Sequence, residues 1–292
     1  EFYATKTMTS EQKPIDFPDT PADQLPDEIL AKEFQAAMDE HQLSLYYQPI
    51  VHLKSGLVAG FETLMRWNHP NRGFISPAVF IPMAERTGLI VEASRWALKE
   101  AIRALKRLES HVGHNEHIYM SVNFSPNDLA DESFLDEMYN VISASDVRPT
   151  QVQLEITGDL LKGQRENSKT ILGICQKTGL KIAIDDYGLG DPNVFFKYMD
   201  DFPISAVKID HLVTCDMLKV PEAKELIMAI ISEAKKRNIT IIAEGVEQKE
   251  EALLLRELGC KYGQGYYFTK PLPERELTTL LLQISAFNEH LT

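Results

Sequence analysis

Cysteine, long apolar runs and positive charge are all scarce in this chain of 292 residues. Its three cysteines, Cys175, Cys215 and Cys260, lie far apart, and no pair has the C-x-x-C spacing. Such usage argues against a disulfide framework and favours a reducing, cytoplasmic location. No segment reaches the roughly 18 uninterrupted apolar residues that span a bilayer. The sequence therefore predicts no membrane segment.

Acidic residues outnumber basic ones, 43 Asp and Glu against 30 Lys and Arg, and the net charge is -13. Such a charge repels other polyanions on average, which argues against nucleic acid polymers and anionic membrane surfaces as partners. A small phosphorylated ligand is still compatible with this charge, provided that metal ions offset the carboxylates around it.

Prolines concentrate near the start of the chain, at Pro14, Pro18, Pro21 and Pro26, among acidic residues. This composition extends a chain and gives it little to bury. We predict a linker or tail over residues 1–30, before a single domain over 31–292. We also expect an upstream sensory or regulatory domain in a longer protein. The alternative is a tail that folds back on the domain.

Strand and helix patterns alternate along the rest of the chain. The predicted strands are 44–51, 57–66, 118–123, 151–157, 181–185, 204–209, 239–243 and 264–268. The predicted helices are 28–40, 77–87, 91–109, 131–144, 165–178, 192–199, 221–237, 248–258 and 273–288. Repeated strand–helix order indicates an α/β fold with a parallel sheet, and about eight strands favour a closed barrel. No G-x-G-x-x-G follows the first strand, which argues against a dinucleotide cofactor.

Polar residues mark most of the predicted strand ends. They are Glu62, Asn123, Glu155, Asp185, Asp186, Lys208, Asp210, Glu244 and Gln264, with Glu247 close behind. One such acid alone is more often a surface residue or a helix cap. In a barrel the strand ends converge, so these side chains would share one cup. Clustered oxygen ligands favour Mg²⁺ or Mn²⁺, and a shared aspartate could bridge two ions roughly 3.5–4 Å apart. The pattern predicts metal-assisted phosphoryl chemistry.

Eight motifs extend this pattern along the chain. They are Tyr47-Gln48-Pro49-Ile50, Glu62-Thr63-Leu64 with Met65-Arg66-Trp67, Ser121-Val122-Asn123-Phe124-Ser125, Leu154-Glu155-Ile156-Thr157, Ile184-Asp185-Asp186-Tyr187-Gly188, Val207-Lys208-Ile209-Asp210, Ala243-Glu244-Gly245-Val246-Glu247 and Gly263-Gln264-Gly265-Tyr266. In this order, they resemble the EAL-domain cyclic di-GMP phosphodiesterases of bacteria over roughly residues 30–290. The resemblance implies a modified TIM-type (β/α)8 barrel whose first strand is antiparallel.

The resemblance also implies roles for individual residues. One metal ion would be held by Glu62, Asn123, Glu155 and Asp185. A second would be held by Asp185 and Asp186 with help from Glu244, which is also the family's proposed general base. Lys208 would orient water or stabilise charge, and Glu247 and Gln264 would position these groups. The dinucleotide, cleaved to linear pGpG, would be contacted by Gln48, Leu64, Arg66 and Gln264.

Some positions depart from the family pattern. Thr63 replaces an alanine, a small change, and His211 replaces an arginine. Gly158 replaces a glutamate that anchors the loop after the double aspartate. That loop is itself altered, as Asp186-Tyr187-Gly188-Leu189-Gly190-Asp191-Pro192-Asn193. Because catalysis is sensitive to small displacements, we expect Asp186 to be less firmly held and the activity to be weak.

Three functions therefore stay open. The first is a metal-dependent phosphodiesterase, the second is an inactive receptor that binds cyclic di-GMP and signals by dimerisation, and the third is a scaffold that binds no nucleotide. The family resemblance implies a homodimer for the first two.

Overall fold

The computed structural model describes residues 26–109, 118–158, 165–188 and 192–289. The predicted linker over 1–30 lies almost wholly outside these residues, and so does the part of the altered loop at 189–191. The strand and helix pattern can be compared with the structure from α1 onward.

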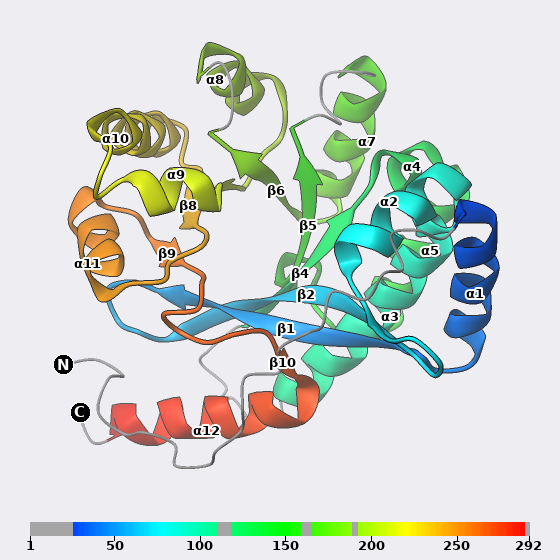
Figure 1. Ribbon diagram of the computed structural model, residues 1–292. Coiled ribbons are helices and arrows are strands. Elements are labelled where there is room, and N and C mark those ends of the chain that lie inside the picture. The colour runs from blue at the N-terminus through cyan, green and yellow to red at the C-terminus, as the bar shows by residue number, and fades with distance from the viewer. Residues whose placement is uncertain (1–25, 110–117, 159–164, 189–191, 290–292) are drawn as a thin grey trace.

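Eight strands close into a barrel (Figure 1). They are β1 (Leu43–His52), β2 (Val58–His69), β4 (Tyr119–Phe124), β5 (Val152–Thr157), β6 (Lys181–Tyr187), β7 (Ala206–Ile209), β8 (Thr240–Ala243) and β9 (Tyr262–Gly263). Around the ring, β1 is antiparallel to its neighbours β2 and β9, and the remaining pairs are parallel. The predicted barrel with an antiparallel first strand is confirmed. Two short strands, β3 (Gly73–Ile75) and β10 (Leu272–Pro273), add to β2 and β1.

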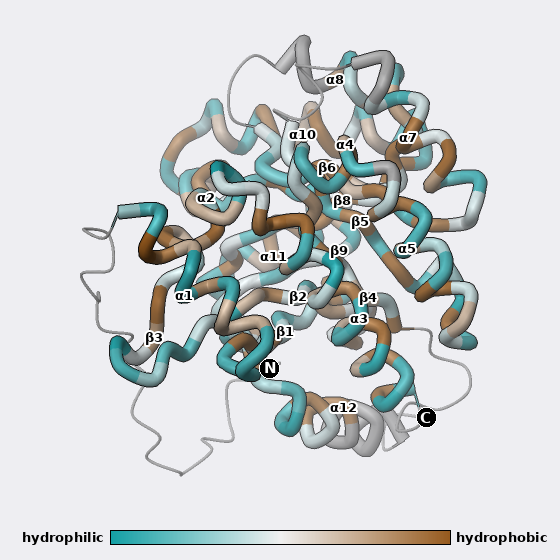
Figure 2. Tube along the Cα trace, turned by 90° about the vertical axis from the view of Figure 1, so that its right-hand side faces the viewer, coloured by the Kyte–Doolittle hydropathy of each residue, from teal (hydrophilic) through white to brown (hydrophobic). Residues whose placement is uncertain are grey.

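Helices surround this barrel (Figure 1). They are α1 (Asp27–Asp39), α2 (Pro77–Thr87), α3 (Ile90–Glu109), α4 (Pro126–Ala130), α5 (Glu132–Ser143), the 3₁₀ turn η2 (Pro149–Gln151), α7 (Arg165–Lys177), α8 (Pro192–Asp201), α9 (His211–Asp216), α10 (Pro221–Lys236), α11 (Lys249–Leu258) and α12 (Glu274–Glu289). Apolar and polar residues alternate along the outer helices in Figure 2, as one buried face per helix requires. None of the described helices is long and apolar enough to cross a membrane.

The predicted strand over 264–268 is wrong. The strand lies earlier, at β9, and residues 265–268 form a turn. At Gly265, φ is +156°, and a Cβ there would lie 2.2 Å from the Val246 carbonyl oxygen. Only glycine permits this approach. The aromatic run that follows Gly265 looks like a strand in the sequence, but the backbone has already left the sheet.

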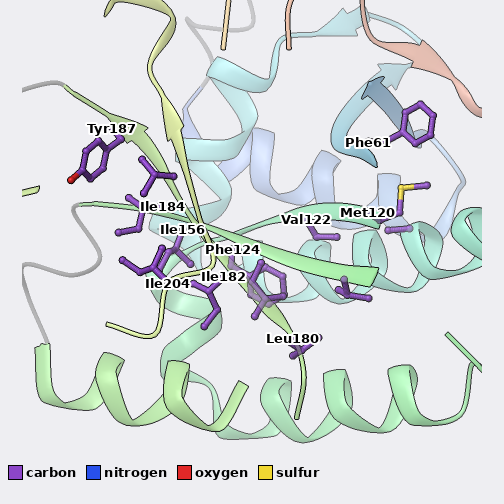
Figure 3. Packing of buried hydrophobic residues seen from close by; sticks show 14 of the residues in the cluster. Phe61, Met120, Val122, Phe124, Ile156, Leu180, Ile182, Ile184, Tyr187 and Ile204 are labelled. Carbon is purple, nitrogen blue, oxygen red and sulfur yellow. The ribbon is translucent and has the colours of Figure 1, made fainter. Parts of the chain in front are cut away.

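Side chains on alternate positions of the strands face two different environments. The outward set packs under the helices, as Figure 3 shows for Val122, Phe124 and Ile182. A separate, smaller cluster fills the other side of the same strands, with Ile50, Tyr119, Ala183, Ala206 and Ile242 at its centre. This second set is an apolar floor inside the barrel. Side chains alternate between the two faces of a strand. Every second residue from this floor toward the carboxyl end of a parallel strand must therefore also point into the barrel.

Helix α4 follows directly after β4 and is fixed by the buried carboxylate of Asp128. One Asp128 oxygen accepts hydrogen bonds from the Ser125 N–H at 2.7 Å, the Ser125 hydroxyl at 2.8 Å and the Ser94 hydroxyl at 3.0 Å. The other oxygen, Oδ1, is buried and accepts no hydrogen bond from the described residues. Burial raises the pKa of Asp128 to about 6, although the Ser125 and Ser94 hydrogen bonds lower it.

Asp128→Asn should change how stability depends on pH. Since the folded-state pKa is raised from 3.8 to about 6, the stability that Asp128 contributes is complete at low pH. It is lost as the pH rises through this interval. The asparagine cannot titrate, so the fall in unfolding free energy between about pH 4 and pH 6 should be roughly 2–3 kcal/mol smaller than in the parent. Urea unfolding at several pH values measures this. Asp146→Asn, at an 89% exposed side chain, is the control, and parallel curves for Asp128→Asn and the parent would contradict the expectation.

Candidate active site

The ammonium group of Lys208 lies at the centre of the inward-facing polar residues. Lys208 Nζ is 2.7 Å from Glu244 Oε1, 2.9 Å from Glu155 Oε2, 3.0 Å from Glu62 Oε2 and 3.5 Å from Asp185 Oδ1. Its side chain is 0% exposed. Each of these residues lies on the inward-facing side of its strand, as the residues of the apolar floor do, or directly after the end of that strand. The barrel therefore gathers four carboxylates around one buried cation.

The charges in this cluster shift one another's protonation. Burial by itself would lower the pKa of Lys208, but the surrounding carboxylates raise it well above its usual value. Burial raises the pKa of Glu155 to about 8, with help from the charges of Glu62 and Asp185. Burial also raises the pKa of Glu244 well above its usual range. One ammonium group offsets only one of the four carboxylate charges, and the raised pKa values of Glu155 and Glu244 reflect burial together with this excess, so the cluster favours additional positive charge, from protons or from a cation.

Glu62 is the exception among these acids. Burial raises its pKa, but Lys208 and hydrogen bonds from Gln264 and Asn123 outweigh burial and lower it. Gln264 Nε2 donates to Glu62 Oε2 at 2.6 Å, and Asn123 Nδ2 donates to Glu62 Oε1 at 3.1 Å. Side chains from β4 and from the turn after β9 thus hold the two carboxylate oxygens of Glu62.

Asp185, Asp186 and Glu244 form the part of the site best suited to a cation. One carboxylate oxygen from each lies within 4.8 Å of the others. Asp185 Oδ1 is buried and accepts no hydrogen bond from the described residues. Its contact with Lys208 Nζ, at 3.5 Å, is long for a hydrogen bond, and a hard divalent cation would satisfy this acceptor better. The donor set therefore fits Mg²⁺ or Mn²⁺.

Asp186 differs from Asp185 in its backbone and exposure. Its φ is +54°, in the left-handed region, and its side chain is exposed. Within the described residues, no hydrogen bond or ion pair holds its carboxylate. Burial and the charges of Asp185 and Asp210 raise its pKa. The expectation that Gly158 and the altered loop leave Asp186 less firmly held stays a prediction.

Two glutamines join β1 to the turn after β9. Gln264 Nε2 donates to Gln48 Oε1 at 3.0 Å, and Gln48 Nε2 donates to the Thr269 carbonyl at 3.5 Å. Gln48 is also paired with Glu62 across β1 and β2. Both glutamines therefore lie beside the carboxylate cluster, and Gln264 Oε1 is a buried acceptor with no donor among the described residues.

The β1–β2 hairpin extends beyond the barrel and carries Leu64 and Arg66. Leu64 is partly buried and pairs with Tyr46, and the Arg66 guanidinium lies 5.5 Å from the centre of the Tyr46 ring. Arg66 Nη1 donates to the Met65 carbonyl at 2.9 Å. Burial lowers the pKa of Arg66, while nearby Tyr266 and Tyr46 raise it. Tyr266, 57% exposed, has no role assigned from the sequence.

The side chain of Glu247 is not part of the Lys208 cluster. It is exposed, and its backbone N–H donates to Glu251 Oε2 at 2.8 Å. Glu251 is the buried acid in this segment and also accepts from the Gln248 N–H at 3.0 Å. The role expected for Glu247 stays a prediction.

Sequence reasoning missed Ser121 and Gln153 as residues beneath the site. Ser121 Oγ donates to Glu155 Oε1, and Gln153 Nε2 donates to Ser121 Oγ at 3.0 Å. The alternation of β4 and β5 was a usable signal, since Ser121 is in phase with Asn123, and Gln153 is in phase with Glu155.

Comparisons with known proteins agree with this arrangement. The EAL domain family matches residues 31–271. The chain is 35% identical over 248 residues to the cyclic di-GMP phosphodiesterase PA2567 of Pseudomonas aeruginosa, covering 85% of this chain and 41% of that relative. It is 33% identical over 257 residues to the probable cyclic di-GMP phosphodiesterase PdeG of Escherichia coli, covering 88% and 49%. The chain thus spans less than half of each of these relatives.

Two solved structures show the same architecture. The EAL enzyme Bd1971, in its cAMP and cyclic-di-GMP bound form, has a TM-score of 0.82 and 31% identity, over 87% of this chain and 69% of that one. The PaMucR phosphodiesterase in complex with c-di-GMP has a TM-score of 0.77 and 32% identity, over 85% and 99%. Given the match over 31–271 and these relatives, the chain belongs to the EAL domain family.

Proposed function

We propose that this chain binds cyclic di-GMP at the carboxyl end of the barrel and hydrolyses it to linear pGpG with two Mg²⁺ or Mn²⁺ ions. The observation that carries the proposal is the group of four carboxylates around Lys208, in which the buried Asp185 Oδ1 has only a long 3.5 Å contact with Lys208 Nζ and no hydrogen bond from the described residues. Relatives named as cyclic di-GMP phosphodiesterases, and similar structures with the dinucleotide bound, support the substrate.

The residues that would hold the ions fall into two overlapping groups. The first ion would be held by Glu62, Asn123, Glu155 and Asp185, and the second by Asp185, Asp186 and Glu244. When bound, such ions supply an acidified water and offset the charge of the phosphodiester.

Glu244 and Lys208 would handle the proton and the developing charge. Glu244 Oε1 accepts from Lys208 Nζ at 2.7 Å, and burial raises the pKa of Glu244, which makes the carboxylate a stronger base. Lys208 stays protonated because the surrounding carboxylates raise its pKa. Its fixed ammonium group can orient water and stabilise negative charge on a phosphate oxygen. Glu247 would act from outside the cluster, by fixing the segment that carries Glu244.

The dinucleotide would lie against the β1–β2 hairpin and the turn after β9. Arg66 presents a planar fork suited to phosphate, and the Tyr46 ring at 5.5 Å helps to fix its plane. Leu64 offers an apolar contact. Gln48 and Gln264, which are hydrogen-bonded to each other, would contact the ligand next to the ions.

We further propose that the chain acts as a cytoplasmic homodimer within a longer protein that carries an upstream sensory or regulatory domain. Exposed apolar side chains on α9, on α10 and between them support a paired surface there: Leu212, Leu218, Val220 and Met228. The segment that carries these side chains begins shortly after β7, and β7 carries Lys208 of the candidate site.

A specific observation also favours a second function, a receptor that binds cyclic di-GMP without cleaving it. Asp186, a ligand expected for the second ion, is exposed, has φ at +54° and makes no hydrogen bond or ion pair with another described residue. A poorly held ligand would weaken the second ion and with it the chemical step, while leaving dinucleotide contacts in place.

Turnover separates these functions. Incubation of the chain with cyclic di-GMP and Mn²⁺ should yield pGpG, and Glu244→Gln should lower kcat by about 10²–10⁴ because the proton acceptor is lost. Glu257→Gln, on the exposed face of α11, is the control and should leave kcat unchanged. Chromatography of the nucleotides measures this. Binding by calorimetry without turnover would support the receptor, and the absence of binding would support a scaffold.

Replacing Lys208, whose ammonium group is the positive charge at the centre of the cluster, should destabilise the metal-free protein. For Lys208→Met we expect a loss of about 3–5 kcal/mol in unfolding free energy at neutral pH, because buried carboxylates lose their partner. Added Mn²⁺ should recover more stability in this variant than in the parent. The control Lys236→Met removes a 64% exposed lysine paired with Glu233 and should cost no more than about 1 kcal/mol. Equal losses in the two variants, measured by urea unfolding with chelator present, would contradict this account.

A further inference from the structure

Two uncharged polar residues are buried in the barrel directly below the carboxylate cluster. Ser121 is 0% exposed and Gln153 is 2% exposed, and they face each other in register on β4 and β5. Below them lies the apolar floor that includes Tyr119. Polar groups at such a position lower stability unless they are hydrogen-bonded, so their partners indicate what they do.

The two residues form a directed chain of hydrogen bonds that ends on Glu155. Gln153 Nε2 donates to Ser121 Oγ at 3.0 Å, and Ser121 Oγ donates to Glu155 Oε1. A hydroxyl has a single hydrogen. Because the Gln153 amide occupies an acceptor position on Ser121 Oγ, the Ser121 hydrogen is directed to the carboxylate.

Glu155 is therefore held from two sides. Ser121 fixes Oε1 from below, and Lys208 Nζ fixes Oε2 at 2.9 Å. The Glu155 side chain is 0% exposed, so bulk solvent does not reach it. If a bound ion weakened the contact between Glu155 and Lys208, the Ser121 hydrogen bond would still hold the Glu155 carboxylate in its orientation.

The backbone of Ser121 is fixed by a separate contact. Thr63 Oγ1 donates to the Ser121 carbonyl at 2.9 Å, and this buried bond does not involve the Ser121 hydroxyl. The structure thus offers one hydrogen bond that reaches Glu155 and another that only supports the strand.

We propose that Ser121 and Gln153 are positioning residues that hold the Glu155 carboxylate in the orientation needed to bind a divalent cation. The inference rests on the proposed function, in which Glu155 holds an ion. A carboxylate that is already oriented loses less freedom on binding, and partners of this kind typically contribute 10- to 100-fold to metal affinity.

The test measures binding of Mn²⁺ alone to the full chain, by calorimetry and by the electron paramagnetic resonance signal of free Mn²⁺. Ser121→Ala should weaken the tightest Mn²⁺ site by about 10- to 100-fold. Gln153→Leu should weaken it in the same direction by a smaller factor, and Ser121→Thr, which keeps a hydroxyl, should restore most of the affinity. Thr63→Ala is the matched control and should leave the Mn²⁺ affinity unchanged, because it removes only the bond to the Ser121 carbonyl.

The outcomes separate this inference from the proposed function. Unchanged Mn²⁺ affinity in both Ser121→Ala and Gln153→Leu, with reduced unfolding free energy, would show a purely structural role and overturn the inference. An equal loss of affinity in Thr63→Ala would overturn it too. If the parent chain binds Mn²⁺ and Ser121→Ala weakens that binding, but no pGpG forms, the inference stands and the hydrolytic function fails. A parent chain that binds no Mn²⁺ would overturn both.

Discussion

The contact between the Lys208 ammonium group and four carboxylates is the interaction on which the rest of this site depends. Lys208 is 0% exposed, and without it the acids from β2, β5, β6 and the end of β8 would repel one another in a buried space. With Lys208 in place, the four carboxylates lie close enough to share its positive charge, but the cluster still carries excess negative charge. The Lys208 contacts thus stabilise the metal-free cluster, and the excess negative charge favours the binding of a divalent ion.

The barrel supports that cluster in layers. An apolar floor with Tyr119 and Ile242 closes the interior, and Ser121 and Gln153 lie above it as an uncharged polar layer. The carboxylates lie above these, where the carboxyl ends of the parallel strands open toward solvent. The apolar floor excludes water from below, so Ser121 and Gln153 must find their hydrogen-bond partners within the protein. The hydrogen bonds that they make end on Glu155.

The two aspartates near the end of β6 differ in how firmly the protein holds them. Asp185 belongs to the layered interior and lies 3.5 Å from Lys208, whereas Asp186 is exposed and has a left-handed backbone. In the proposed function, Asp185 would be the firmly held ligand of the ions and Asp186 the loosely held one. In the proposed function, the balance between cleaving and only binding a dinucleotide would depend on this difference, and the family resemblance assigns a loop-anchoring glutamate to the position of Gly158.

The sequence by itself determined the barrel, because short apolar strands alternate with amphipathic helices and motifs such as Ile184-Asp185-Asp186 mark strand ends. It also indicated that Glu62, Asn123, Glu155 and Asp185 share one rim. It could not place Glu247 outside the cluster, and it misplaced the last strand, since aromatic residues after Gly265 have a strand pattern in a tight turn. Only the tertiary structure decided that Lys208 contacts four acids and that Gln153 reaches Glu155 through Ser121. The reason is physical: the register between neighbouring strands determines which inward side chains meet at one level, and closure of the barrel fixes that register.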